Sequence, residues 1–143
     1  MTPRKTFLAL LIAGAAATAA LAQQGPTDPQ IAHIVVTANQ VDIAAGKLAG
    51  KRGSTRDVRA FGKQMVTDHT AVNRQATALV HKLHVTPEAN ATSAGLQKGG
   101  DDNRAKLGKL KGKAFDKAYV DHEVAYHQAV IDAVDKTLLP NAK

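Results

Sequence analysis

Apolar residues recur along most of the chain at intervals of three and four positions, the spacing that places them on one face of an α-helix. The first segment with this spacing begins at Ile31 and ends near Gly50 and Gly53. We predict a helix there, preceded by a flexible lead-in over residues 23–30 that contains two prolines. The apolar face of this helix comprises Ile31, Ile34, Val35, Ala38, Val41, Ala45, Leu48 and Ala49.

A second, longer helix is predicted over residues 55–84. Ser54 can cap its start, since Asp57 follows three residues later in the manner of a capping box. Asp68 and His69 interrupt the apolar face in the middle of the helix, and both project close to its centre. The apolar positions are Val58, Phe61, Met65, Val72, Ala76, Leu79 and Leu83.

The second half of the chain begins with a less regular stretch. Thr86 and Pro87 end the second helix, and the small and polar residues up to Gly100 predict a loop with weak helical character. Asp101 or Asp102 can then cap a short third helix.

A last long helix is predicted over residues 113–138 and ends before Pro140. No segment alternates as a strand would, so we predict an all-α fold. It is an up-and-down bundle of two long and two shorter helices, and residues 31–143 form this one domain. The inward-facing positions of the last helix are Phe115, Tyr119, Val120, His122, Glu123, Tyr126, His127, Val130, Ile131, Ala133 and Val134.

Two seven-residue segments share the pattern Val-x-x-His-x-Ala-Val. They are residues 66–72, which contain His69, and residues 124–130, which contain His127. Each lies in the middle of a long helix that is the second of a pair, as in a duplicated helical hairpin. Four-helix bundles build metal sites from carboxylates and histidines that project into the core.

Six side chains are therefore candidate metal ligands. Imidazole and carboxylate together suit iron, zinc, copper or manganese. The Glu-x-x-His spacing of diiron bundles does not occur, however, and two interpretations remain. The preferred one is a structural network in which His69 and His127 hydrogen-bond to Asp42, Asp68, Asp116 or Tyr126; the other is a metal site. The candidates are Asp42, Asp68, His69, Asp116, Glu123 and His127.

Residues 1–22 have the pattern of a secretory signal peptide. Arg4 and Lys5 precede an apolar run, and Ala20-Leu21-Ala22 supplies the small residues that signal peptidase reads, so cleavage is expected before Gln23. An uncleaved membrane anchor is the weaker alternative, because the run is short and rich in alanine. We expect the mature protein in the periplasm or outside the cell, with 17 basic and 12 acidic side chains and a net charge of +5.

Composition narrows the classes further. The chain of 143 residues has no cysteine, which excludes disulfides, thiolate metal sites and a cysteine nucleophile. With three Phe, two Tyr and no Trp, its core must consist mainly of small aliphatic residues, which favours closely packed helices. No serine or threonine lies beside a histidine in a recognisable catalytic arrangement, so we do not expect nucleophilic catalysis.

A cluster of six basic residues lies near the start of the last helix. A solvated face is the default interpretation, and contact with an anionic envelope surface is the functional alternative. Nucleic-acid binding is not expected, since no aromatic residues interleave with the lysines. The cluster comprises Arg104, Lys106, Lys109, Lys111, Lys113 and Lys117.

From Ile31 onward the chain resembles the domain of unknown function family 4142. The resemblance rests on residues 41–49, on the string Phe61-Gly-Lys-Gln-Met-Val-Thr-Asp-His69, on residues 110–121 and on the segment around His127. The family comprises secreted bacterial proteins regarded as ferritin-like. The resemblance implies a ferritin-like helical bundle in the envelope and no established activity.

The chain departs from the family in three places. The family usually has Glu at the position of Asp42 and Asp-His at that of Tyr126-His127. Family members also continue with a further amphipathic helix after the position of Lys143. Either fewer helices close the bundle here or the gene is truncated, and a missing helix would leave an apolar groove that invites a homodimer.

These features leave two functional hypotheses. The first is an exported, non-enzymatic bundle whose inward histidines and carboxylates are structural. The second is a ferritin-like metal-binding protein with a redox or stress-protective role.

Overall fold

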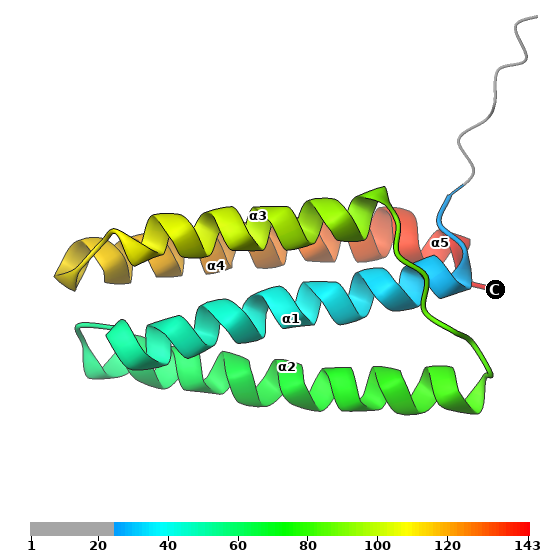
Figure 1. The fold of residues 1–143 in the computed structure, drawn as a ribbon, viewed down its shortest axis with the longest axis horizontal. Coiled ribbons are helices and arrows are strands. Elements are labelled where there is room, and N and C mark those ends of the chain that lie inside the picture. The colour runs from blue at the N-terminus through cyan, green and yellow to red at the C-terminus, as the bar shows by residue number, and fades with distance from the viewer. Residues whose placement is uncertain (1–24) are drawn as a thin grey trace, which may run out of the picture.

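The computed structural model describes residues 25–143, and this part of the chain is a bundle of four long antiparallel helices (Figure 1). It contains no strand, so the all-α prediction is confirmed for these residues. The predicted signal peptide lies outside them. The helices are α1 (Asp28–Arg52), α2 (Arg56–Lys82), α3 (Ala91–Gly108) and α4 (Gly112–Ala133), followed by a π-helical turn, η1 (Val134–Leu138), and a short α5 (Leu139–Asn141).

The bundle consists of two hairpins, α1–α2 and α3–α4, whose turns lie at the same end (Figure 1). Residues 83–90 connect the hairpins at the opposite end. Helix α1 packs against the other three helices, and α2 packs mainly against α1. Among residues 25–143 we find no helix that is both long and apolar enough to span a membrane.

Two glycines set the close spacing of α1 and α2. A Cβ atom on Gly62 would lie 2.7 Å from the carbonyl oxygen of Gly46, and one on Gly46 would lie 2.6 Å from that of Gly62. Both distances are too short for a side chain, so this approach requires glycine on each helix. The close spacing lets side chains in the middle of α2 reach α1.

The turns of the two hairpins are tied together. Arg52 Nη1 donates to the carbonyl of Gly108 (2.9 Å), and Nη2 donates to that of Leu110 (2.8 Å). Asp116 on α4 accepts hydrogen bonds from the amide and hydroxyl of Ser54 and from the amide of Thr55. Next to these contacts lies the fully buried core of Ala45, Ala49, Leu107, Phe115 and Tyr119.

The start of α1 and the cap of α2 differ from the prediction, because local hydrogen bonds determine both. Helix α1 starts at Asp28, three residues early, because Pro29 fits the first turn of a helix and Gln30 accepts from the amide of Thr27. Helix α2 is capped by Thr55, whose hydroxyl accepts from the amide of Val58. The predicted cap, Ser54, instead donates to Asp116.

The predicted loop up to Gly100 is wrong. Asn90 caps a helix that starts at Ala91: its side-chain oxygen accepts from the amide of Ser93, and the Ser93 hydroxyl accepts from the amide of Asn90. Gly100 faces α1, where a Cβ atom would lie 2.8 Å from the side chain of Val41. One of the glycines that weakened the helical pattern is therefore needed for helix packing.

Part of the predicted apolar core is exposed. Val72 and Leu79 on α2, Leu83 directly after it and Ile131 on α4 lie at the surface. For the residues of α2 this follows from its packing, which is mainly against α1. An apolar groove of about 500 Å³ runs between the helices, mainly in the half of the bundle away from the turns. Its apolar lining includes Ile34, Val35, Val72, Leu96, Val130, Val134 and Leu138.

Candidate metal centre

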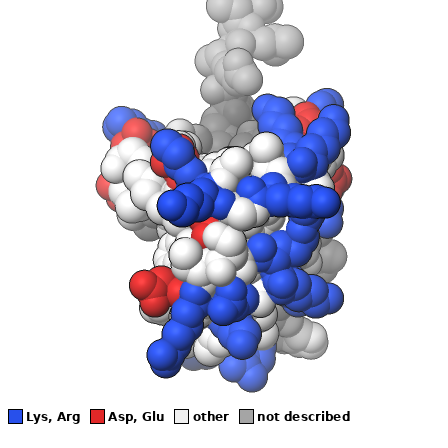
Figure 2. All heavy atoms as spheres, turned by 90° about the vertical axis from the view of Figure 1, so that its left-hand side faces the viewer, with Lys and Arg blue, Asp and Glu red and all other residues white. Residues whose placement is uncertain are grey.

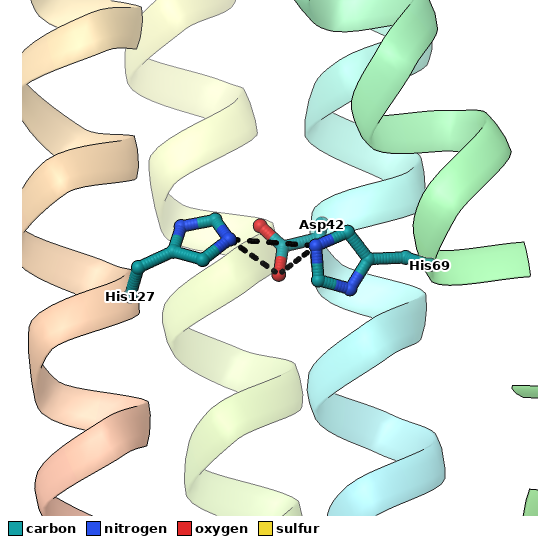
Figure 3. A group of neighbouring side chains, drawn as sticks. All are labelled: Asp42, His69 and His127. Atoms are coloured by element: carbon teal, nitrogen blue, oxygen red, sulfur yellow. Dashed lines mark hydrogen bonds and ion pairs between the residues drawn. The ribbon is translucent and has the colours of Figure 1, made fainter. Parts of the chain in front are cut away.

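Three of the six predicted ligands meet in the middle of the bundle (Figure 3). Asp42 comes from α1, His69 from α2 and His127 from α4, and the two rings point at the carboxylate from opposite sides. Asp42 Oδ2 lies 3.4 Å from His69 Nε2 and 4.0 Å from His127 Nε2. The two Nε2 atoms are 3.4 Å apart.

These distances leave room for one metal ion. The three atoms form a triangle with sides of 3.4, 3.4 and 4.0 Å. The centre of such a triangle lies about 2.1 Å from each corner, which equals the length of a bond from Zn²⁺ to imidazole nitrogen or carboxylate oxygen. The same separations are too long for strong direct hydrogen bonds between the three groups.

The far nitrogen of each ring is held by an oxygen atom. His69 Nδ1 lies 2.6 Å from Asn39 Oδ1, and His127 Nδ1 lies 2.8 Å from the backbone oxygen of Glu123. Asn39 is oriented by its own amide group, which donates to the carbonyl of Val35. Because oxygen can only accept here, each Nδ1 carries the hydrogen and each Nε2 presents a lone pair, as in histidines that bind metals.

Burial makes a charged carboxylate costly at this position. Asp42 is only 3% exposed, and burial, reinforced by the neighbouring Glu123 carboxylate, raises the pKa of Asp42 to about 8. Burial also lowers the pKa of His69, and His127 acts in the same direction. A proton on Asp42 can satisfy only one of the two imidazole lone pairs, whereas a divalent cation satisfies all three groups.

Glu123 adds a second buried carboxyl group next to the cluster. It lies one turn before His127 on α4, is 1% exposed, and neither of its oxygens has a hydrogen-bond partner among the described residues. The Tyr119 hydroxyl and His122 Nδ1 are also buried without a partner. Polar atoms left in this way are rare in proteins and indicate a missing proton, water or ion.

Asp68 and Asp116, the other two predicted ligands, lie away from this cluster. Asp68 is exposed on α2, because adjacent helical residues point about 100° apart and His69 takes the inward position. Asp116 binds the α1–α2 turn at the end of the bundle. Tyr126, a predicted partner of the histidines, donates instead to the carbonyl of Ala38.

Asn39 is the residue that the sequence analysis missed. It lies one turn before Asp42, on the same face of α1, and is buried. A polar residue between Ala38 and Val41 in an otherwise apolar stripe was the signal that could have revealed it.

The cluster opens onto the apolar groove. Asn39, Asp42, His69, Tyr126 and His127 form the polar part of its lining. Water or a small ligand can therefore reach the side of the site that protein atoms leave free.

Comparison with known proteins places the chain in a family without assigning an activity. No curated protein and no solved structure is significantly similar to it. The model of the family described as "Domain of unknown function (DUF4142)" matches residues 13–143. This match covers nearly the whole chain, and the protein belongs to the DUF4142 family.

Proposed function

We propose that this protein binds one divalent transition-metal ion through Asp42, His69 and His127. The observation that carries the proposal is the orientation of the two rings. Each Nδ1 hydrogen is used by an oxygen atom, so both Nε2 lone pairs converge with a buried carboxylate on one point. The two lone pairs and the carboxylate repel one another unless a cation or shared protons lie between them.

The contacts argue against the purely structural network that the sequence favoured. His69 and His127 make their short hydrogen bonds to Asn39 and to the backbone, with their Nδ1 atoms. Asp68, Asp116 and Tyr126 take no part. A network that existed only for stability would also not leave both buried oxygens of Glu123 without a hydrogen bond.

The donor set selects among metals. Two imidazoles and one carboxylate suit Zn²⁺ or Fe²⁺ and also bind Cu²⁺ or Mn²⁺, whereas Mg²⁺ and Ca²⁺ prefer oxygen donors alone. Three protein ligands leave a coordination position free for water or a small ligand. Glu123 lies beside Asp42 and His127 and is placed to accept a proton when the metal binds. The proposal includes the second hypothesis from the sequence: a ferritin-like metal-binding protein with a redox or stress-protective role.

The test is a titration of the chelator-treated full chain with Zn²⁺, Fe²⁺ and Mn²⁺, followed by calorimetry and elemental analysis. We expect one ion per chain, and we expect His69→Ala and His127→Ala to lower the affinity at least 100-fold. His81→Ala is the matched control, because His81 is exposed on the same helix as His69.

The proposal fails if folded wild-type protein binds none of these ions. It also fails if the two histidine variants bind as tightly as the control variant. Circular dichroism of each variant shows whether the helices are intact.

We also propose that the protein works in the bacterial envelope. The support is the sequence of residues 1–22, with Arg4 and Lys5, the apolar run and Ala20-Leu21-Ala22. The mass of the protein recovered from the periplasm tests this: a chain that starts at Gln23 is the expected product. A full-length mass or retention in the cytosol would contradict it.

A further inference from the structure

The two hairpin turns bring together basic residues that are far apart in the sequence. Figure 2 views the bundle from the end that carries these turns, and Lys and Arg cover much of that face. The α1–α2 hairpin contributes Lys51 and Arg56, which join four lysines at the end of α3 and the start of α4. We call this set the basic end. It has six members, all exposed: Lys51, Arg56, Lys106, Lys109, Lys111 and Lys113.

Little acidic charge offsets the basic end. Among residues 25–143, none of its six members forms an ion pair. The two acidic residues near the turns are Asp57, which is exposed, and Asp116, which is buried and occupied by Ser54 and Thr55. Arg104 and Lys117, which the sequence grouped with these lysines, are paired with Asp101 and Asp121 instead.

The same contacts that join the turns keep the basic end in one shape. Arg52 ties α1 to the carbonyls of Gly108 and Leu110, and Arg59 donates to the carbonyls of Gly53 and Ser54. Arg52 and Arg59 are therefore held by hydrogen bonds within the protein. The six residues of the basic end project from this fixed support, so their binding to a surface orders fewer groups than binding through a flexible tail would.

We propose that the basic end docks the protein on an anionic lipid bilayer, with the long axis of the bundle pointing away from the surface. Six like charges on one blunt end suit a broad anionic plane. An electrostatic contact of this kind extends only about a Debye length from the membrane. Phe115, the aromatic residue nearest the turns, is fully buried, so the contact is electrostatic, without insertion of a side chain into the lipid.

This orientation leaves the candidate metal centre accessible. Asp42, His69 and His127 lie near the middle of their helices, and the residues that line their groove come mainly from the halves of the helices away from the turns. The docked protein would hold the metal at a fixed height above the lipid. Docking does not rest on metal binding, because no member of the basic end is a candidate ligand.

The test is co-sedimentation of the full chain with vesicles of phosphatidylcholine containing phosphatidylglycerol at low and high salt. We expect binding to the anionic vesicles at low salt, loss at high salt, and no binding to pure phosphatidylcholine. The triple change Lys106→Glu, Lys109→Glu and Lys111→Glu should weaken binding about 100-fold, because each cation near the surface contributes roughly a fivefold factor.

The matched control is Arg74→Glu, Lys82→Glu and Lys143→Glu, which changes the net charge equally at exposed positions away from the turns. The proposal predicts near wild-type binding for this control. Equal weakening of both triple variants would overturn it, since net charge alone would then explain the binding. Failure to bind anionic vesicles, or a preference for dissolved dextran sulfate over them, would also overturn it.

Discussion

The hydrogen bond from His69 to Asn39 decides which nitrogen of the ring faces the candidate metal centre. Replacing Asn39 with alanine removes the acceptor and frees the ring to turn or to exchange tautomers. We expect Asn39→Ala to lower Zn²⁺ affinity about 10- to 100-fold, as the loss of a hydrogen bond that orients a metal-binding histidine does at other metal sites. Calorimetric titration measures this.

Asn73→Ala is the control for that experiment, because Asn73 also donates from α2 to the backbone of α1 but makes no hydrogen bond to His69. An Asn39→Ala protein with wild-type affinity would mean that the ring is held by packing alone.

Asp42 makes the stability of the metal-free protein depend on pH. Its pKa is about 8 in the folded protein and near the ordinary value of 3.8 when unfolded. Between these values the folded state holds the extra proton, so the contribution of Asp42 to the free energy of unfolding is complete below pH 4. It declines as the pH rises and is lost above pH 8.

Asp42→Asn should remove this decline. Relative to wild type, the metal-free variant should gain at least about 1.4 kcal/mol between pH 5 and pH 8, which corresponds to a pKa change of one. Urea denaturation of chelator-treated proteins at both pH values measures the difference. A difference that is the same at both pH values would contradict the prediction.

For single residues, the sequence pattern predicted which side chains face the core better than it predicted which groups they contact. Asp42, His69 and His127 were named as candidates because they project from apolar helix faces and because the two histidines share one sequence pattern. Asp68 could not be separated from His69 by periodicity, since both lie near the same face until packing selects one of them. Asp116 faces inward as expected, but at the turn end, where the amides of Ser54 and Thr55 need an acceptor.

At the scale of the helices, the same substitution can be compared at a glycine packed between two helices and at one on an open helix surface. Gly62 lies against Gly46 and Gly50 of α1, whereas a Cβ atom on Gly95 in α3 would meet nothing within 4 Å. We expect Gly62→Ala to destabilise the protein by about 1–3 kcal/mol through overpacking. Gly95→Ala should stabilise it by about 0.5–1 kcal/mol, because alanine is the better helix former.

Thermal or urea unfolding measures both changes. Equal effects of the two substitutions would show that α1 and α2 can move apart at no cost. In that case the spacing that brings His69 to α1 would not depend on Gly46 and Gly62.

The helices that the sequence predicted well were those with long apolar faces, α1, α2 and α4. The first half of α3 was predicted as a loop because its residues up to Gly100 are small and polar, and only a short helix was predicted from Asp101 or Asp102 onward. Two features invisible to periodicity form it: the reciprocal cap of Asn90 and Ser93, and the packing of Gly100 against Val41. Exposure of the second half of α2 depends on where α4 lies, which no local pattern contains.

At the scale of the whole molecule, the candidate centre adds a contact between α2 and α4, which otherwise meet mainly where Phe61 packs against Tyr119. His69 comes from α2 and His127 from α4, while α1 provides Asp42. A bound ion should therefore stabilise the whole bundle, because it links three helices and not only the residues next to it. At a free concentration 100 times the dissociation constant, we expect Zn²⁺ to raise the free energy of unfolding by about 2.7 kcal/mol.

Thermal denaturation with and without Zn²⁺ checks this prediction, with His127→Ala as the variant that should not respond. Hydrogen exchange should slow in α4 as well as in α1 and α2. Slowing confined to α1 and α2 would mean that His127 is not a ligand.

The distribution of the three candidate ligands over α1, α2 and α4 also sets the order in which the proposed metal site can form. A chain still being synthesised, or one threaded unfolded through a membrane, has the donors but not the pocket, since His127 is brought to the other two only when the second hairpin docks on the first. Capture of the ion would then be the last step of maturation, and the metal content of a preparation would count its correctly assembled molecules.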